Sequence, residues 1–288
     1  MADQAELLRL KIKQQQGMKL ANTLAVISGK GGVGKSNFSL NFSILLSKLG
    51  KQVLLFDMDI GMGNIDILMG NGSDRTIVDF FQKGFSLKEV ISSGPEGLSY
   101  ISGGTGLTNL FSMSSQQFER FTNEFAIIQC EYDCIIFDLG AGISVESSRF
   151  LMCVDEIIAI TTPEPTSIMD AYSIIKYLHI QNEEIPIFLV CNRTEREKQG
   201  KEAIKKIRST LNRFIGRDIT PLGFLPDSKV VSKAVAEQTP FLILSPNADI
   251  SIALRQLTKN YLSHTYHEQL VLVKQTFIDK LKNSFIGR

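Results

Sequence analysis

The chain has 288 residues, of which 43% are hydrophobic and 21% charged, and its 31 Lys and Arg residues balance 30 Asp and Glu residues at a net charge of +1. These values are ordinary for a folded globular protein. They argue against a disordered regulator, a collagen-like chain and a strongly basic protein that coats nucleic acid. No apolar run reaches the roughly 18–20 residues that span a bilayer, and the start of the chain lacks the apolar core of a signal peptide. We therefore expect a cytoplasmic protein, with attachment to a membrane surface left open.

Residues 1–19 are polar and are expected to form a short helix or a mobile tail. From Thr23 on, short apolar runs alternate with helical patterns, which is typical of βαβ units and a largely parallel sheet. The predicted strands cover 23–28, 52–57, 97–102, 134–139, 156–162 and 186–192, with a weaker strand at 220–225. The predicted helices cover 37–50, 114–130, 145–153, 166–180, 196–215, 228–236, 248–263 and 267–286. The fold prediction is therefore α/β, with a doubly wound, mostly parallel β-sheet flanked by helices. Its parts are an N-terminal segment at 1–19, one domain over 20–266 and a C-terminal segment at 267–288.

A glycine-rich loop follows the first predicted strand. Residues 29–36 read G-K-G-G-V-G-K-S, which fits the phosphate-loop pattern G-x-x-x-x-G-K-[ST] between a strand and a helix. Its glycines let backbone N–H groups surround phosphate oxygens, and the helix N-terminus adds positive potential. Lys35 supplies charge to the β- and γ-phosphates, and Ser36 offers a hydroxyl to Mg²⁺. The predicted nucleotide-binding residues here are Gly29, Lys30, Gly31, Gly32, Val33, Gly34, Lys35, Ser36 and Asn37.

Acidic residues stand at the ends of two predicted strands. Asp57 and Asp59 follow the apolar run QVLLF, and Asp138 follows CIIF. The carboxyl ends of parallel strands face the phosphate crevice. One carboxylate there can hold Mg²⁺ through water, and another can orient or deprotonate the attacking water.

The second lysine of the loop, Lys30, carries a resemblance to a known family. A simple phosphate loop needs no charge at this position, and K-G-G-V-G-K-S resembles the deviant Walker A motif of the MinD/ParA group. Members of that group dimerise with two ATP molecules between them. The resemblance implies a P-loop ATPase that forms a homodimer with ATP, in which Lys30 reaches the nucleotide of the partner subunit.

The same resemblance assigns roles to the acidic residues. The segment FDMDIGMGNIDILMG at 56–70 is similar to the first switch of MinD. This similarity implies that Asp57 acts on Mg²⁺ through water, that Asp59 positions the hydrolytic water, and that Asn64 approaches the nucleotide. Asp138 resembles the Walker B acid on the magnesium shell, although Gly140 stands where the MinD pattern D-x-P-A-G has proline. The implied cofactors are ATP or ADP and Mg²⁺, held by Ser36, Asp57 and Asp138.

Two further loops resemble those that surround the adenine in MinD relatives. They contain Asn192 and Arg193 after one strand, and Pro226 and Asp227 after the next. An asparagine amide can pair with the donor and acceptor edge of adenine. The chain contains no N-K-x-D or T-K-x-D guanine motif, so we expect ATP rather than GTP. Glu164 matches a loop near the ribose and the dimer face.

The C-terminal run KQTFIDKLKNSFIGR has an amphipathic pattern. At about 100° per residue, one apolar stripe with flanking lysines comprises Phe277, Ile278, Lys280, Leu281, Lys282 and Phe285. Such a stripe can lie on an anionic membrane surface, and a core-packing last helix is the alternative. One copy would bind marginally, whereas two copies on an ATP dimer would bind together.

The N-terminus resembles a narrower family. Residues 3–9 fit D-Q-A-x-x-L-R, the signature of the FlhG family, MinD-like regulators of flagellar number and placement. In that family the segment docks on the GTPase FlhF and stimulates its hydrolysis. The resemblance assigns this role to Asp3, Gln4, Ala5, Leu8 and Arg9, with Gln4 ordering a water beside the γ-phosphate. Flagellar basal-body (C-ring) proteins are further candidate partners.

Other functions compete with this interpretation. The main alternative is a ParA- or MinD-like ATPase for DNA partition or cell-division positioning, but the balanced charge predicts no nucleic-acid partner. An iron–sulfur reductase would need cysteines beside the second switch, the D-L-G-A-G segment at 138–142, and the spacing of Cys134 and Cys153 around it is wrong for this. Because no C-x-x-C pair is present, we expect reduced, mostly buried thiols, with a metal site as the alternative. A small-substrate ligase lacks support for a substrate pocket.

Overall fold

The computed structural model describes residues 20–59, 63–70, 72–104, 113–182, 184–267 and 275–286. Among these residues, eight strands form one sheet in the order β3-β4-β2-β5-β1-β6-β7-β8. All neighbouring strands are parallel except β3 and β4. The strands are β1 (Asn22–Ser28), β2 (Val53–Asp57), β3 (Ser92–Ser93), β4 (Ser99–Ile101), β5 (Cys134–Asp138), β6 (Glu156–Thr161), β7 (Ile187–Thr194) and β8 (Thr220–Pro226).

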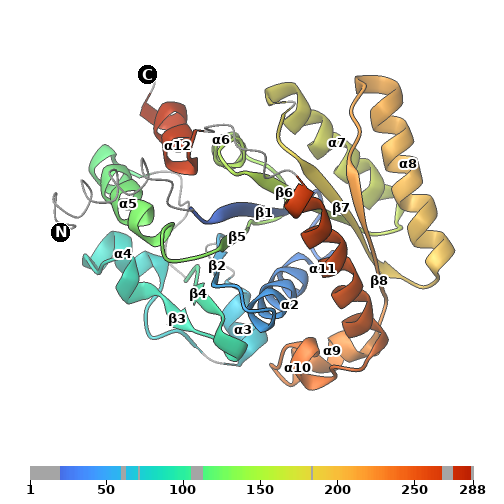
Figure 1. Cartoon of the computed structure of the whole chain (residues 1–288), viewed down its shortest axis with the longest axis horizontal. Coiled ribbons are helices and arrows are strands. Elements are labelled where there is room, and N and C mark those ends of the chain that lie inside the picture. The colour runs from blue at the N-terminus through green and yellow to red at the C-terminus, as the bar shows by residue number, and fades with distance from the viewer. Residues whose placement is uncertain are drawn as a thin grey trace.

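Helices cover both faces of this sheet (Figure 1). One face carries α4 (Ile77–Lys83), α5 (Ser115–Ile128), α6 (Val145–Leu151), α7 (Pro165–Gln181), α8 (Glu197–Ile215) and α12 (Phe277–Ile286). The other face carries α2 (Lys35–Lys48), α3 (Ile65–Met69), α9 (Lys229–Ala236), α10 (Phe241–Leu244) and α11 (Asp249–His267). Two short 3-10 helices, η1 (Lys88–Val90) and η2 (Pro95–Gly97), flank β3.

The apolar runs of the sequence become strands that are buried on both sides. β2, β5 and β6 are buried along their whole length. Side chains alternate between the two faces of a strand, so Ala25 and Ile27 of β1 join one core and Leu24 and Val26 join the other. The predicted doubly wound α/β fold is confirmed, and it brings the carboxyl ends of β1, β2 and β5 together.

Several short elements were not predicted. α3, α4 and α10 have 5, 7 and 4 residues, and β3 has two. Such lengths are too short for a periodic apolar pattern to be distinctive. The predicted last helix at 267–286 was also too long, because α11 continues to His267 and α12 begins at Phe277. The proposed division at residues 19 and 266 stays a prediction.

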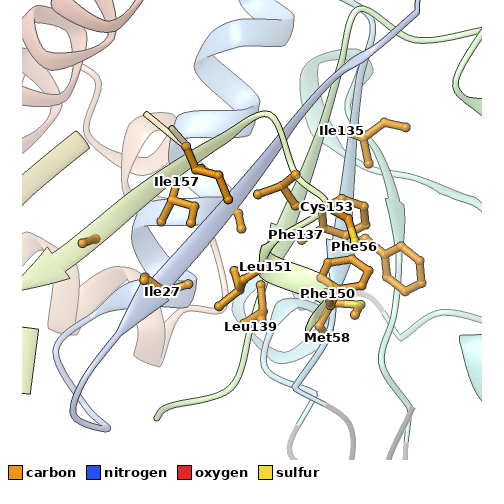
Figure 2. Packing of buried hydrophobic residues seen from close by; sticks show 14 of the residues in the cluster. Ile27, Phe56, Met58, Ile135, Phe137, Leu139, Phe150, Leu151, Cys153 and Ile157 are labelled. Atoms are coloured by element: carbon orange, nitrogen blue, oxygen red, sulfur yellow. The ribbon is translucent and has the colours of Figure 1, made fainter. Parts of the chain in front are cut away.

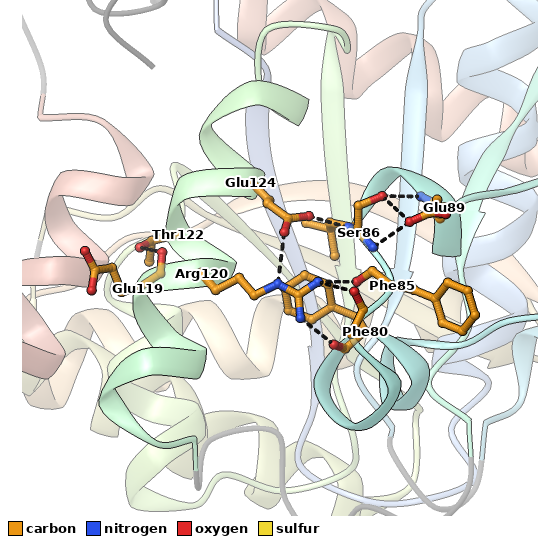
Figure 3. Close-up of polar contacts among 10 residues, drawn as sticks. Phe80, Phe85, Ser86, Glu89, Glu119, Arg120, Thr122 and Glu124 are labelled. Carbon is orange, nitrogen blue, oxygen red and sulfur yellow. Dashed lines mark hydrogen bonds and ion pairs between the residues drawn. The ribbon is translucent and has the colours of Figure 1, made fainter. Parts of the chain in front are cut away.

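Arg120 of α5 fixes the end of α4 (Figure 3). Its guanidinium donates hydrogen bonds to the carbonyl oxygens of Phe80 (3.1 Å), Gly84 (3.0 Å) and Phe85, and it pairs with Glu124 (3.1 Å). The last carbonyls of a helix have no partner within the helix. Arg120 satisfies such carbonyls and so holds α4 against α5.

The last helix packs on an aromatic part of the core. The ring of Phe277 lies 5.3 Å from Phe125 of α5, 5.5 Å from Phe137 of β5 and 5.3 Å from Phe150 of α6, measured between ring centroids. Figure 2 shows Phe137 and Phe150 within the same core cluster, next to Cys153. We call Phe125, Phe137 and Phe150 the α12 seat. No helix in the ranges given above is long and apolar enough to cross a bilayer.

Candidate nucleotide-binding site

The glycine loop leaves β1 and enters α2 through left-handed backbone. Gly32 and Gly34 have φ angles of 77° and 91°, a region that favours glycine. A Cβ on Gly34 would also lie 2.5 Å from the side-chain nitrogen of Asn192. α2 then begins at Lys35 without a side-chain cap or an acidic residue in its first turn. Its free N–H groups and positive end therefore face the loop, as anion binding requires.

A pocket of about 360 Å³ opens above this helix end. Nine of the predicted nucleotide-binding or catalytic residues line it, namely Gly31, Gly32, Gly34, Lys35, Ser36, Asn37, Asp59, Asn64 and Arg193. Ile67, within the segment that resembles the first switch, and Val235, which no sequence motif indicated, also line it. We call this the phosphate pocket, because the loop and the helix end form its floor.

Two buried carboxylates lie side by side beneath the pocket. Asp57 and Asp138 are partners in the register of β2 and β5, and both are fully buried. Asp138 Oδ1 accepts hydrogen bonds from Lys35 Nζ (2.9 Å) and from Ser39 Oγ (2.8 Å). Ser39 was not predicted, although its position one helical turn after Lys35 could have indicated it.

The second oxygen of Asp138 suits a magnesium ion. Asp138 Oδ2 is buried and has no hydrogen-bond partner in the structure. Leaving such an oxygen unpaired is costly, and Mg²⁺ is held by carboxylate oxygens, hydroxyls and waters. Asp138, Asp57 and Ser36 are thus the residues that would hold the ion, and the ion would neutralise charge on the phosphates.

Asp57 ties the first switch to the sheet. Its carboxylate accepts hydrogen bonds from the backbone N–H groups of Asp59 (3.0 Å), Asn64 (3.0 Å) and Ile65 (3.3 Å). Burial and the nearby charge of Asp138 raise the pKa of Asp57 to about 7, and the backbone donors act in the opposite direction. Burial also raises the pKa of Asp59, against the effect of Lys35. A raised pKa suits a carboxylate that must orient or accept a proton from water.

A second pocket of about 250 Å³ adjoins the phosphate pocket at Gly34 and Asn37. The predicted base-binding residues Asn192, Arg193, Pro226 and Asp227 all line it. Unpredicted lining residues come from α9, α10 and α11, namely Val231, Ser232, Phe241 and Ile250. Val231 and Ser232 closely follow the Asp227 loop, whereas the apolar Phe241 and Ile250 are distant in sequence from every motif.

The Asn192 amide is already engaged within the protein. Its Nδ2 donates to the carbonyl oxygen of Val33 (2.8 Å), and its Oδ1 accepts from the backbone N–H of Arg193 (2.9 Å). Asn192 therefore supports the phosphate loop, and its predicted pairing with adenine would require these bonds to be exchanged. Arg193 has a φ of 56°, which is uncommon for a residue with a side chain.

Lys30 does not line either pocket of its own subunit. Its Nζ lies 2.9 Å from Glu164 Oε2, and the two side chains are 46% and 60% exposed. The hydrogen bond from Lys30 lowers the pKa of Glu164. Glu164 was predicted near the nucleotide, but here its described contact is with Lys30, and it lines neither pocket.

The predicted membrane residues lie on the opposite side of the fold from α2. Phe277, Ile278 and Leu281 are buried at 1%, 7% and 2% exposure. Lys280 Nζ lies 3.6 Å from Asp155 Oδ1, and Lys282 is half-buried. In this conformation the core covers these side chains, as the alternative of a core-packing last helix expects, and their membrane role stays a prediction. The side chain of Phe285 and the N-terminal residues Asp3, Gln4, Ala5, Leu8 and Arg9 fall outside what the structure describes.

The four cysteines lie mostly in the interior of the protein. All four cysteines are free, and Cys134, Cys153 and Cys191 are buried. Within the described ranges, no group of three or more His, Cys, Asp and Glu side chains could hold a metal ion. The prediction of mostly buried thiols is therefore confirmed for Cys134, Cys153 and Cys191.

Comparisons with known proteins agree with this site. The CobQ/CobB/MinD/ParA nucleotide binding domain matches residues 24–241. The chain is 29% identical to the antiactivator FleN of Pseudomonas aeruginosa, over 86% of this chain and 89% of the relative. It is 31% identical to the flagellum site-determining protein YlxH of Helicobacter pylori, over 81% of this chain and 79% of the relative.

Solved structures share the fold. MinD in the MinC:MinD cell division complex of Aquifex aeolicus superposes with a TM-score of 0.69 at 23% identity, covering 89% of this chain and all of that one. MinD of Pyrococcus horikoshii in complex with Mg-ADP gives 0.68 at 19% identity, covering 88% and 100%. Together with the phosphate loop and the paired acids, these matches confirm the predicted resemblance. The chain belongs to the CobQ/CobB/MinD/ParA nucleotide-binding family and is a MinD-like P-loop ATPase.

Proposed function

We propose that this ATPase uses ATP to switch between a monomer and a membrane-attached homodimer, and that the switch controls flagellar number and placement. The observation that carries the proposal is the position of Lys30. Its charge stands outside its own phosphate pocket, half-exposed and held by Glu164. A cation there is available to the nucleotide of a second copy, as the motif resemblance implies. The names of FleN and YlxH support a regulatory role.

Apolar side chains around the site support a dimer face. Ile67 of α3, Met169 of α7 and Val235 of α9 are 56%, 57% and 39% exposed, and Ile67 and Val235 border the phosphate pocket. Exposed apolar groups around a polar site are typical of an interaction surface. A second copy would cover them when two nucleotides are enclosed.

We expect the Lys30–Glu164 ion pair to oppose ATP-dependent dimerisation slightly. Exposed ion pairs are weak, so Glu164→Gln should tighten ATP-dependent dimerisation by no more than about two- to five-fold. Sedimentation equilibrium with a non-hydrolysable ATP analogue measures this, and Glu184→Gln, at another exposed carboxylate, is the matched control. Weaker dimerisation of Glu164→Gln would instead assign Glu164 an attractive role across the interface.

Membrane attachment requires α12 to leave its seat. Burying Phe277, Ile278 and Leu281 contributes roughly 4–9 kcal/mol before the opposing terms, so lipid and core compete for the same side chains. The seat adjoins the acids beneath the phosphate pocket, because Phe137 directly precedes Asp138 and Phe150 lies on α6, which follows the second switch. A change at either position on ATP binding would loosen α12, and two released helices on one dimer would bind an anionic surface together.

The N-terminal segment is proposed to stimulate the GTPase FlhF, as the D-Q-A-x-x-L-R signature implies, and C-ring proteins are proposed as further partners. A peptide of residues 1–20 should therefore accelerate GTP hydrolysis by that GTPase, and Gln4→Ala in the peptide should remove the effect. Phosphate release measures both. If the Gln4→Ala peptide accelerates hydrolysis equally well, Gln4 does not order the attacking water. If neither peptide acts, the segment has another role.

A positioning ATPase for cell division or partition remains the second candidate. Sequence similarity to the septum site-determining protein MinD of Bacillus subtilis supports it, at 28% identity over 92% of this chain and 98% of that relative. A DNA-binding version would show a salt-sensitive shift of duplex DNA. The proposed flagellar regulator would show none.

A further inference from the structure

A groove separate from the nucleotide site runs between α8 and β8. It has a volume of about 540 Å³ and shares no lining residue with the phosphate pocket or with the second pocket, which contains Asn192 and Asp227. β8 is the last strand of the sheet and has β7 as its one neighbour, and α8 lies alongside it at the edge of the molecule (Figure 1). At Gly200, α8 is so close to β8 that an added Cβ would come within 2.8 Å of Phe224 Cβ. The groove begins directly after this contact, at Lys201.

The floor of the groove is apolar and its rim is cationic. Ile204 is buried and Phe224 is half-buried, and both pack in the core cluster on the α8 face of the sheet. Lys201, Lys205 and Arg208 form the rim on the side of α8. Between residues 197 and 218 there are seven cationic and three acidic side chains, a net charge of +4, although the whole chain carries only +1. The charge is therefore concentrated here.

The nearby acid does not neutralise the rim. Asp218 is the one acidic residue among the described lining residues, and Arg208 holds its carboxylate through two contacts of 3.0 and 2.7 Å. This pair lowers the pKa of Asp218. Lys201 contacts Glu197 on the exposed side of the helix, and Lys205 has no ion-pair partner among the described residues. An anionic, partly apolar ligand would meet the unpaired Lys205 above the apolar floor, and its carboxylates would compete with the exposed Glu197 for Lys201.

We infer that this groove binds an extended acidic peptide segment of a partner protein. Alternate side chains of an extended peptide point to opposite sides, so one set can rest on Ile204 and Phe224 while carboxylates reach Lys201 and Lys205. An exposed sheet edge is a recurrent place for such a segment. Nucleic acid fits less well, because a sugar–phosphate backbone gains nothing from the apolar floor and meets Glu197 and Glu202 between the lysines.

The test uses the full-length protein without nucleotide and is therefore independent of the proposed switch. The probe is a short fluorescent peptide of alternating Asp and Val, and fluorescence anisotropy at about 0.15 M ionic strength, where the Debye length is about 8 Å, reports its binding. We expect saturable binding that falls by at least about ten-fold in the Lys201→Glu/Lys205→Glu double variant, because like charges then face each other. The same peptide with Asn in place of Asp should bind as weakly.

The matched control reverses two exposed cations of α8 that do not line the groove, Lys206 and Arg213. The Lys206→Glu/Arg213→Glu variant changes the net charge equally and should weaken binding by less than about three-fold, because screened distant charges contribute little. Both variants should keep the wild-type ATP turnover and melting temperature. Equal losses in the two variants, absence of saturable binding, or tighter binding of single-stranded DNA at the same site would each overturn the proposal.

Discussion

The Asp59→Ala variant is expected to bind ATP, to hydrolyse it more slowly by a factor on the order of 10²–10⁴, and to accumulate as a dimer. Asp59 borders the phosphate pocket, and its Oδ2 lies 3.4 Å from the Nδ2 of Asn64. We expect it to orient a water, whereas we expect Lys35, Ser36 and the backbone of the loop to hold the phosphates. Removing its carboxylate should therefore leave ATP binding unchanged and block the hydrolysis that dissociates the dimer.

Single-turnover hydrolysis, nucleotide binding and light scattering measure the three effects on one preparation. Asp74→Ala is the matched control, because Asp74 is an exposed aspartate beyond the first switch and does not line the phosphate pocket. It should behave as the wild type in all three assays. An Asp59→Ala variant that stays monomeric with ATP, or that hydrolyses ATP at the wild-type rate, would remove Asp59 from this role.

The second large effect is expected in the α12 seat. Phe125→Ala removes a ring that Phe277 contacts while leaving the apolar face of α12 intact. Truncating a buried phenylalanine costs about 3–5 kcal/mol, so a large part of the energy that holds α12 is lost. We expect this variant to sediment with anionic liposomes without ATP, whereas the wild type should need ATP.

The reactivity of Cys153 measures the release of α12 from its seat without lipid. It is 1% exposed, burial raises its pKa to about 12, and Lys280 of α12 acts against that shift. Release of α12 should therefore speed its alkylation, measured in a Cys130→Ser background. Phe121→Ala is the matched control, because Phe121 is buried on the same helix and its ring contacts do not include Phe277. If Phe125→Ala and Phe121→Ala behave alike, the seat does not control membrane binding.

The phosphate loop could be predicted because its chemistry is local. All of its donors lie within residues 29–37, and the spacing of glycines and lysine states the function directly. The acids were also predictable, because parallel strands place their carboxyl ends at one edge. This reasoning placed Asp57 and Asp138 at the same edge, and the register of β2 and β5 makes them direct neighbours although about eighty residues separate them.

Other features depend on contacts that a sequence pattern does not carry. Asn192 supports the backbone of Val33, 159 residues away, and a backbone carbonyl leaves no signature in the sequence. The stripe of Phe277, Ile278 and Leu281 has the same spacing whether it meets lipid or core. In the described conformation the stripe packs on the core, because α5, β5 and α6 supply the aromatic side chains of the α12 seat. These elements are distant from α12 in the sequence.

The central claim is that ATP joins two copies through Lys30. Its most direct test is the mass of the full-length protein in solution, measured by light scattering coupled to size exclusion with Mg²⁺ and either ADP or a non-hydrolysable ATP analogue. The account predicts a monomer with ADP, a dimer with the analogue, and a monomer with both nucleotides for Lys30→Ala, which should still bind them. A wild-type monomer with the analogue bound, or a Lys30→Ala variant that dimerises normally, would contradict it.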